Sequence, residues 1–237
     1  MRRLLLIVLF AAGARAHDFW IEPSTFRPER GKSFTAALRV GEHFKGDPVP
    51  RRSARIESFV VRNATGEQAI NGFENQDPAG FVRIDEAGTA VIGYRGKPTP
   101  HELPSAKFAQ FLREEGITGL QPSGERQRER FYRFAKAVVQ VGDAATSPAP
   151  FGWRYELVPT STGARLLFEQ KPLANVLVTA MSPEGKRLTA RTDAGGNVAL
   201  PLGKGVWLVK ATHVLPAAKG SGYDWDSLWA SLTFERR

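Results

Sequence analysis

The sequence contains no cysteine and only 4 histidines among 237 residues. Without cysteine the chain can form no disulfide and has no cysteine nucleophile, so its fold must be held together by burial alone. Other catalytic signatures are also missing, including the Gly-x-Ser-x-Gly elbow, the Walker loop, a Gly-x-Gly-x-x-Gly motif after a strand and His-Glu-x-x-His. No pair of carboxylates has a spacing that marks it for acid–base chemistry. We therefore expect a non-catalytic protein.

Long hydrophobic runs are confined to the first residues. Met1 to Ala16 combines a basic start, an apolar run from Leu4 to Ala12 and small residues before a cleavage point after Ala16. This is the pattern of a secretory signal peptide. The run is shorter than the about 20 apolar residues that a membrane helix needs. We expect residues 1–16 to be removed, leaving a periplasmic or secreted protein with no membrane span and, since no cysteine follows the cleavage point, no lipid anchor.

Acidic residues are outnumbered, with 24 Asp and Glu against 33 Lys and Arg and a formal net charge of +9. A basic balance can favour nucleic acid, acidic lipids or anionic glycans. The basic residues are scattered, however, and the densest run, Gly124 to Arg130, interleaves arginine with glutamate. Such a run is typical of a solvated helix face. Together with export, it argues against a nucleic-acid partner.

Most of the chain alternates between apolar and polar residues with a period of two, as half-buried strands do. Phe34 to Val40, Trp153 to Leu157 and Leu228 to Phe234 are clear cases, and Gly-rich turns such as Asp193 to Asn197 separate the strands. Short strands at this spacing indicate β-sandwiches and not a parallel sheet. The fold class that we expect is mainly β, with two sandwich domains.

Two segments break the strand pattern. Ala106 to Glu115 has apolar residues at helical spacing, with Ser105 as N-cap and Gly116 as the stop signal. Glu125 to Lys136 places three apolar residues on one helical face. The sequence therefore predicts a two-helix insertion at about residues 105–136.

Residues 142–150 are small, polar and proline-containing, which is the composition of a linker. We place a domain boundary near residue 145. Residues 17–145 would form an immunoglobulin-like sandwich that carries the helical insertion. Residues 150–237, in which a strand, a Gly-rich turn and a returning strand follow one another, resemble a prealbumin-like or collagen-adhesin B-type sandwich.

The predicted cleavage would make His17 the first residue of the mature chain. A terminal histidine offers its α-amino nitrogen and a ring nitrogen to the same ion, closing a chelate that an internal histidine cannot form. Both groups lose their protons near neutral pH, at reference pKa values of about 7.7–8.0 and about 6.5. Such nitrogen ligands suit Cu(II), Ni(II), Co(II) and Zn(II). A solvated terminus is the alternative for His17.

The other candidate ligands are spread along the chain. His43 lies in a loop flanked by Gly41 and Gly46, and His213 ends a strand-like run. Each could instead be an ordinary loop or edge histidine. Three weaker candidates lie in extended or loop segments: His101, Asp18 and Asp224. Of these, His101 lies among prolines with no evident partner, and the two carboxylates could ligate the ion or orient an imidazole.

Several stretches together resemble a known family: HDFWIEPSTF after the leader, VGEHFKGDPV, SAKFAQFLREEG, RERFYRFAKAVVQVG, GVWLVKATHV and DWDSLWASLTFE. They are similar to the NikM-like domain-of-unknown-function family of secreted bacterial proteins, often described as periplasmic components of cobalt or nickel transport. The resemblance covers essentially the whole mature chain. It implies a metal-associated protein in which His17, His43 and His213 fall in shared motifs, whereas His101 does not.

We therefore expect a periplasmic protein that binds nickel, cobalt, copper or zinc through His17, His43 and His213, and buffers the ion or passes it to a membrane transporter. Two alternatives stay open. One is an extracytoplasmic module whose loops bind a protein or glycan, with no metal role. The other is a copper-dependent oxidative enzyme that uses the terminal histidine as a brace. Convergence of the three histidines would favour a metal over the binding module.

Overall fold

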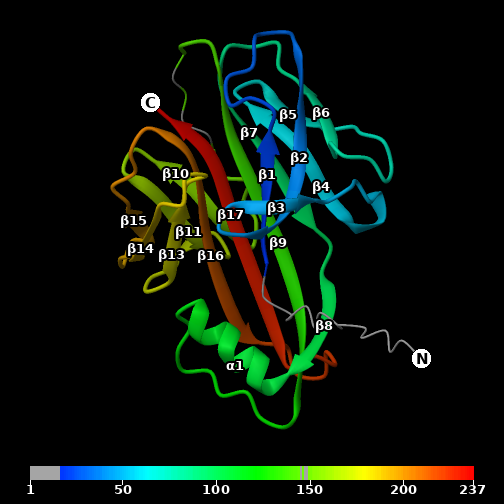
Figure 1. The fold of residues 1–237 in the computed structure, drawn as a ribbon, viewed down its shortest axis with the longest axis vertical. Coiled ribbons are helices and arrows are strands. Elements are labelled where there is room, and N and C mark those ends of the chain that lie inside the picture. Colours follow the sequence, from blue (N-terminus) through cyan, green and yellow to red (C-terminus); the bar gives the residue numbers. More distant parts are fainter. Residues whose placement is uncertain (1–16, 145, 147–148) are drawn as a thin grey trace, which may run out of the picture.

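The computed structural model describes residues 17–144, 146 and 149–237 (Figure 1). The predicted signal peptide, 1–16, and the predicted boundary at residue 145 lie outside these residues. The chain is mainly β, as its alternating pattern predicts. The strands are β1 (Asp18–Pro23), β2 (Ser33–Glu42), β3 (Lys45–Pro48), β4 (Ile56–Asn63), β5 (Gly66–Ala69), β6 (Gly80–Arg83), β7 (Gly88–Gly96), β8 (Thr99–Pro104), β9 (Arg126–Val141), β10 (Tyr155–Thr160), β11 (Gly163–Phe168), β12 (Lys171–Pro172), β13 (Leu177–Met181), β14 (Arg187–Arg191), β15 (Asn197–Ala199), β16 (Gly205–Pro216) and β17 (Trp225–Arg236). The helices are α1 (Ser105–Glu114) and a short 3-10 turn, η1 (Ser53–Arg55).

The strands form three sheets. The largest runs in the order β14-β13-β16-β17-β9-β7-β4-β5, with β8 paired to β9. A small sheet, β1-β2-β3 with β6 on β2, comes from the first part of the chain, and another, β10-β11-β12 with β15 on β11, comes from the last part. Neighbours in the large sheet are antiparallel except for β17 and β9, which run parallel and lie side by side in Figure 1.

The two small sheets cover opposite faces of the large one, because successive side chains of a strand point to opposite faces. On β9, Ala135 and Ala137 belong to the core under the β1-β2-β3 sheet. Phe134, whose side chain points to the opposite face, belongs to the core under the β10-β11-β12 sheet, and Val138 packs on that core as well. The central strand β9 therefore contributes to both hydrophobic cores.

The first predicted helix is confirmed. Expected at Ala106 to Glu115, it spans Ser105–Glu114, buries Phe108, Phe111 and Leu112, and is followed by Gly116 in the left-handed conformation with φ +62°. The buried helix face packs on Trp225 and Trp229 of β17. Tertiary contacts of an amphipathic face of this kind are what stabilise a short helix.

The second predicted helix, Glu125 to Lys136, is wrong, because this segment forms the first part of strand β9. The three apolar residues at helical spacing misled the prediction. The arginines of this run alternate with Gln127 and Glu129, which are buried and satisfied by Trp225 and Ser227 of β17. The segment therefore alternates as a strand does, but the side chains on its buried face, Gln127 and Glu129, are polar.

Strands from both sides of the predicted domain boundary lie in the large sheet. β4, β5, β7 and β9 precede it in the chain, and β13, β14, β16 and β17 follow it. The division into 17–145 and 150–237 stays a prediction, and the two parts share one continuous sheet through the β9–β17 pairing. Among the described residues, no helix has the length and apolar character needed to cross a membrane.

Candidate functional site

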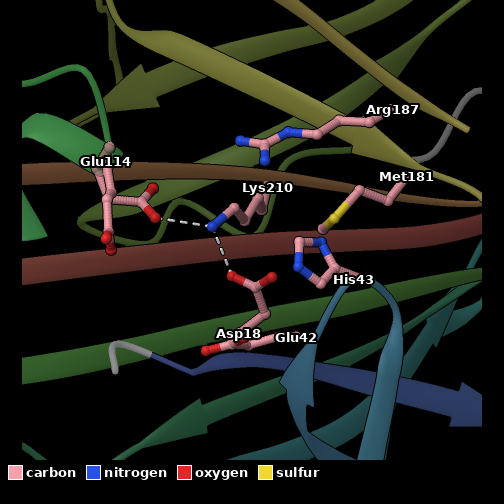
Figure 2. A pocket seen from close by; sticks show the side chains of 8 residues that line it. Asp18, Glu42, His43, Glu114, Met181, Arg187 and Lys210 are labelled. Atoms are coloured by element: carbon pink, nitrogen blue, oxygen red, sulfur yellow. Dashed lines mark hydrogen bonds and ion pairs between the residues drawn. The ribbon is translucent and has the colours of Figure 1, made fainter. Parts of the chain in front are cut away.

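A pocket of about 380 Å³ opens where the start of β1, the β2–β3 hairpin, the end of α1 and strands β13, β14 and β16 meet. Figure 2 shows the side chains around it. The lining residues are Asp18, Glu42, His43, Glu114, Glu115, Met181, Arg187 and Lys210. Four carboxylates and two cations give this lining a formal charge of −2, with His43 taken as neutral. The pocket is thus acidic in a chain whose net charge is +9.

Lys210 forms the charged floor of the pocket. Its Nζ donates a hydrogen bond to Glu115 Oε1 at 2.8 Å and makes an ion pair with Asp18 Oδ1 at 2.7 Å. The two dashed lines in Figure 2 mark these contacts. Thr212 Oγ1 donates to the other carboxylate oxygen of Glu115 at 2.9 Å. The network joins the start of β1 and the residue after α1 to strand β16.

Burial sets the protonation of this network. It raises the pKa of Asp18 above its usual value, with Lys210 opposing the change and the Glu115 and Glu42 charges reinforcing it. Burial also lowers the pKa of Lys210, but the carboxylates of Asp18 and Glu115 outweigh it, so that the pKa of Lys210 ends above its usual value. Lys210 is therefore a permanent positive charge at neutral pH. Asp18 Oδ1 is buried and, despite the ion pair, accepts no hydrogen bond from any described residue.

The β2–β3 hairpin carries His43 to the rim of the pocket. His43 and Phe44 are its two turn residues, with φ values of +54° and +59°, as a type I′ turn requires. The flanking Gly41 and Gly46 pair across the two strands, where a Cβ on Gly41 would lie 2.1 Å from the backbone oxygen of Lys45. The exposed imidazole of His43 is left facing the pocket (Figure 2).

Phe44 fixes this turn to the body of the protein. Its ring meets that of Trp20 edge-on, with 5.5 Å between the centroids. Trp20 is only 2% exposed and packs with Met181 and Leu208 below the pocket. Such aromatic pairs contribute about 0.5–1.5 kcal/mol beyond their buried area. The contact holds the turn, and with it His43, in place.

His17 lies beside Glu42, which lines the pocket. Asp18, the first residue of β1, pairs with Gly41 of β2, so His17, just before β1, comes beside Glu42, the last residue of β2. His17 Nε2 lies 3.9 Å from Glu42 Oε1, with side-chain exposures of 49% and 31%. Bonds of about 2.0–2.2 Å to a shared ion place two donors up to about 4 Å apart. His17 thus approaches Glu42 at the end of β2, and His43 follows Glu42 in the chain.

His213 lies on the other face of the large sheet. Lys210 and Thr212 of β16 both contact Glu115, and His213 points the opposite way, with its ring 5.1 Å from that of Phe168. Burial lowers the pKa of His213, and the charge of Arg154 lowers it further. The sequence could not reveal this separation, since it follows from which face of β16 covers which small sheet.

Two weaker candidates have structural partners elsewhere. His101 Nδ1 on β8 lies 2.9 Å from Glu129 Oε1, and the buried Glu129 also accepts a hydrogen bond from Ser227. Asp224, just before β17, accepts the backbone N–H of Arg128 at 2.7 Å. Neither His101 nor Asp224 lines the pocket. Asp18 does line it, with Lys210 as its partner.

Over residues 17–144, 146 and 149–237, no group of three or more His, Cys, Asp or Glu side chains is arranged to hold a metal ion. The mouth supplies the pair His17 and Glu42, with His43 next along the chain. A third donor atom would come from the α-amine of His17 once the leader is removed. That amine belongs to the same residue as one of the two side chains.

Sequence reasoning missed most of the acidic lining. A lysine inside the apolar run VWLVKATHV was a usable signal for Lys210, because an internal charge in a strand needs a buried partner. Glu42 stands next to His43 in the chain and could have been included with it. No comparable signal exists for Glu115 or Arg187, which reach the pocket only through the packing of α1 and β14.

Comparison with known proteins identifies the family of the chain. No curated protein and no solved structure is significantly similar to the chain. A family model described as a domain of unknown function, DUF4198, matches residues 14–215, which include the pocket residues and all four histidines. The chain is therefore a member of the DUF4198 family.

Proposed function

We propose that the protein binds a divalent transition-metal ion, of the nickel, cobalt, copper or zinc type, at the mouth of the acidic pocket. The observation that carries the proposal is the approach of His17 Nε2 to Glu42 Oε1 at 3.9 Å, and both Glu42 and the exposed His43 line the pocket. His213 has no part in this site, because it lies on the opposite face of the large sheet.

The chemistry of the donors supports such an ion. After removal of residues 1–16, His17 would offer its amine and a ring nitrogen, and Glu42 an oxygen. Imidazole and amine nitrogens favour copper, nickel and zinc over calcium or magnesium, which prefer oxygen ligands. His43, held on its turn by the Phe44–Trp20 contact, is the nearest further imidazole on this rim.

The charge of the pocket supports a cation as well. The lining carries −2 within a basic protein, so the field at the mouth attracts positive charge locally. The positive charge of Lys210 does not cancel this field, because Lys210 is paired with two carboxylates, Asp18 and Glu115. Glu42 and Glu114 add two further carboxylates to the lining.

We further propose that the site works outside the cytoplasm, as the predicted leader implies, where it would buffer the ion or hand it to a membrane transporter. The exposed position of His17 and His43 suits transfer, since both ligands can be reached from solvent. A buried site with closed coordination would instead suit a structural ion.

Calorimetric titration with Ni(II), Co(II) and Cu(II) of protein that begins at His17 tests the proposal. We expect one ion per chain. A matched protein with one glycine before His17 loses the terminal chelate but keeps every side chain, and should bind at least about tenfold more weakly. Equal affinities of the two proteins would rule out the chelate, and no binding by either would rule out the site.

A further inference from the structure

A second and smaller cavity lies between β1 and the large sheet. Its volume is about 10 Å³, and its walls come from the start of β1 and from strands β9, β16 and β17. A space of about 10–15 Å³ is enough for one water molecule and too small for an organic ligand. The size of the cavity therefore limits its occupant to a water molecule or a single ion.

Two buried polar atoms on these walls have no hydrogen-bond partner among the residues that the structure describes. They are Oγ of Ser231 on β17 and Oδ1 of Asp18 on β1, which belong to residues only 5% and 7% exposed. Lys210 balances the charge of Asp18 in an ion pair, but Asp18 Oδ1 accepts no hydrogen bond from it. Buried polar atoms of folded proteins almost always have a protein or water partner. Two such atoms beside one cavity point to a molecule that both of them contact.

Thr233 shows how the next hydroxyl on the same face of β17 is satisfied. Side chains two residues apart on a strand point to the same face. Thr233 Oγ1 donates directly to the backbone oxygen of Ile21 on β1, at 2.7 Å. Ser231 lines the cavity under the start of β1, but its hydroxyl reaches no acceptor in the described chain. At Ser231 the cavity takes the place of that direct contact between the two strands.

The charges around the cavity select a neutral occupant. Arg133 and Lys210 would repel a cation, and the carboxylate of Asp18 would repel an anion. A water molecule can donate to Asp18 Oδ1 and, at the same time, accept from the Ser231 hydroxyl or the Arg133 guanidinium. Buried waters typically make about three hydrogen bonds, and these three side chains can supply them.

We propose that one water molecule is bound in this cavity and bridges Asp18 Oδ1 and Ser231 Oγ, with the Arg133 guanidinium as its third partner. The water joins the first residue of β1 to a central strand of the large sheet. It does not depend on the proposed metal, because none of these three side chains is a ligand of that ion.

A crystal structure of protein that begins at His17 provides the first test. We expect one peak of electron density in the cavity, about 2.5–3.0 Å from both Asp18 Oδ1 and Ser231 Oγ. The absence of this peak, or a direct hydrogen bond between the two side chains, overturns the inference. Anomalous scattering from the cavity in crystals soaked in bromide also overturns it, because the occupant would then be an anion.

Oxygen-17 relaxation dispersion of the solvent counts long-lived internal waters in solution and provides the second test. Ser231→Val replaces the hydroxyl by a methyl group and adds a second methyl, similar in size to a water molecule, so it should lower the count by one. Thr233→Val is the matched control, since Thr233 lies on the same face of β17 but does not line the cavity, and it should leave the count unchanged. An unchanged count in Ser231→Val, or an equal fall in both variants, overturns the inference. Should Ser231→Val fail to fold, the crystal structure decides alone.

Discussion

Replacing His43 by asparagine should stabilise the protein and weaken its metal binding at the same time. His43 is the first turn residue of the β2–β3 hairpin and has φ +54°. The left-handed region costs an ordinary L-residue about 1–2 kcal/mol, whereas asparagine is a preferred residue of type I′ turns. Histidine tolerates this region better than most residues. We therefore expect His43→Asn to gain about 0.5–1 kcal/mol of unfolding free energy.

Few contacts oppose this gain. The imidazole is exposed, and the ring that packs on Trp20 belongs to Phe44, which stays in place. For a domain of this size the gain corresponds to a rise in melting temperature of about 1–4 °C. The same substitution removes an imidazole from the pocket rim, and we expect at least about tenfold weaker Ni(II) binding.

A second hairpin provides the control. Glu169 and Gln170 form the turn between β11 and β12, with φ values of +48° and +64°. Glu169→Asn should stabilise the protein to a similar extent without affecting Ni(II) affinity, because this turn does not line the pocket. Urea denaturation of the metal-free proteins and calorimetric titration measure the two effects. If Glu169→Asn stabilises and His43→Asn does not, the reasoning about the turn fails. If His43→Asn binds Ni(II) as the unaltered protein does, His43 is no ligand.

Three further predictions concern buried or paired charges. Lys136→Met should lower the unfolding free energy by about 3–5 kcal/mol in urea denaturation, because it leaves the buried Glu156 without its cation, and adding Glu156→Gln should recover part of the loss; a double variant less stable than the single one would refute this. Lys210→Met should destabilise at pH 7 and less so at pH 5, where the carboxyl of Asp18, whose pKa is already raised by burial, can take up a proton; an equal loss at both pH values would contradict it. The hydrogen bond to Glu129 raises the pKa of His101 above 6.5, so its contribution is present below pH 6.5 and is lost as the pH rises through the higher folded-state value. Since the His101 side chain is 40% exposed, we expect the pair to contribute less than about 1 kcal/mol. His101→Gln should reduce the change of the unfolding free energy with pH between pH 5 and 8; the same pH dependence in both proteins would refute the pairing.

The strands were predictable where one face of a strand is apolar and the other polar. The run Gly205 to Val214 was expected to be a strand, and β16 covers it as Gly205–Pro216. The period of two is a local property of the chain and needs no knowledge of the partner strand. Where the inward face is itself polar, as at Gln127 and Glu129, the local pattern failed, since those side chains are satisfied by residues about 98 positions away.

The candidate site was predictable only in part. His17 comes beside Glu42 because β1 and β2 pair in one register, and the sequence alone does not reveal that register. His213 was grouped with them on the strength of shared motifs, but which face of β16 it occupies depends on how the two small sheets cover the large one. The metal itself stays a prediction.

The shared strand β9 has a consequence for how the protein can be divided. Because adjacent residues Phe134 and Ala135 belong to different cores, loss of either core removes support from the other, and we expect both to melt in a single cooperative transition. A fragment that starts at residue 150 would expose the edge of β17 that pairs with Glu129 to Ala137. An unprotected edge of this length invites pairing between chains, so such a fragment should aggregate. Chimeras and truncations of this protein therefore need to keep β9 together with β17.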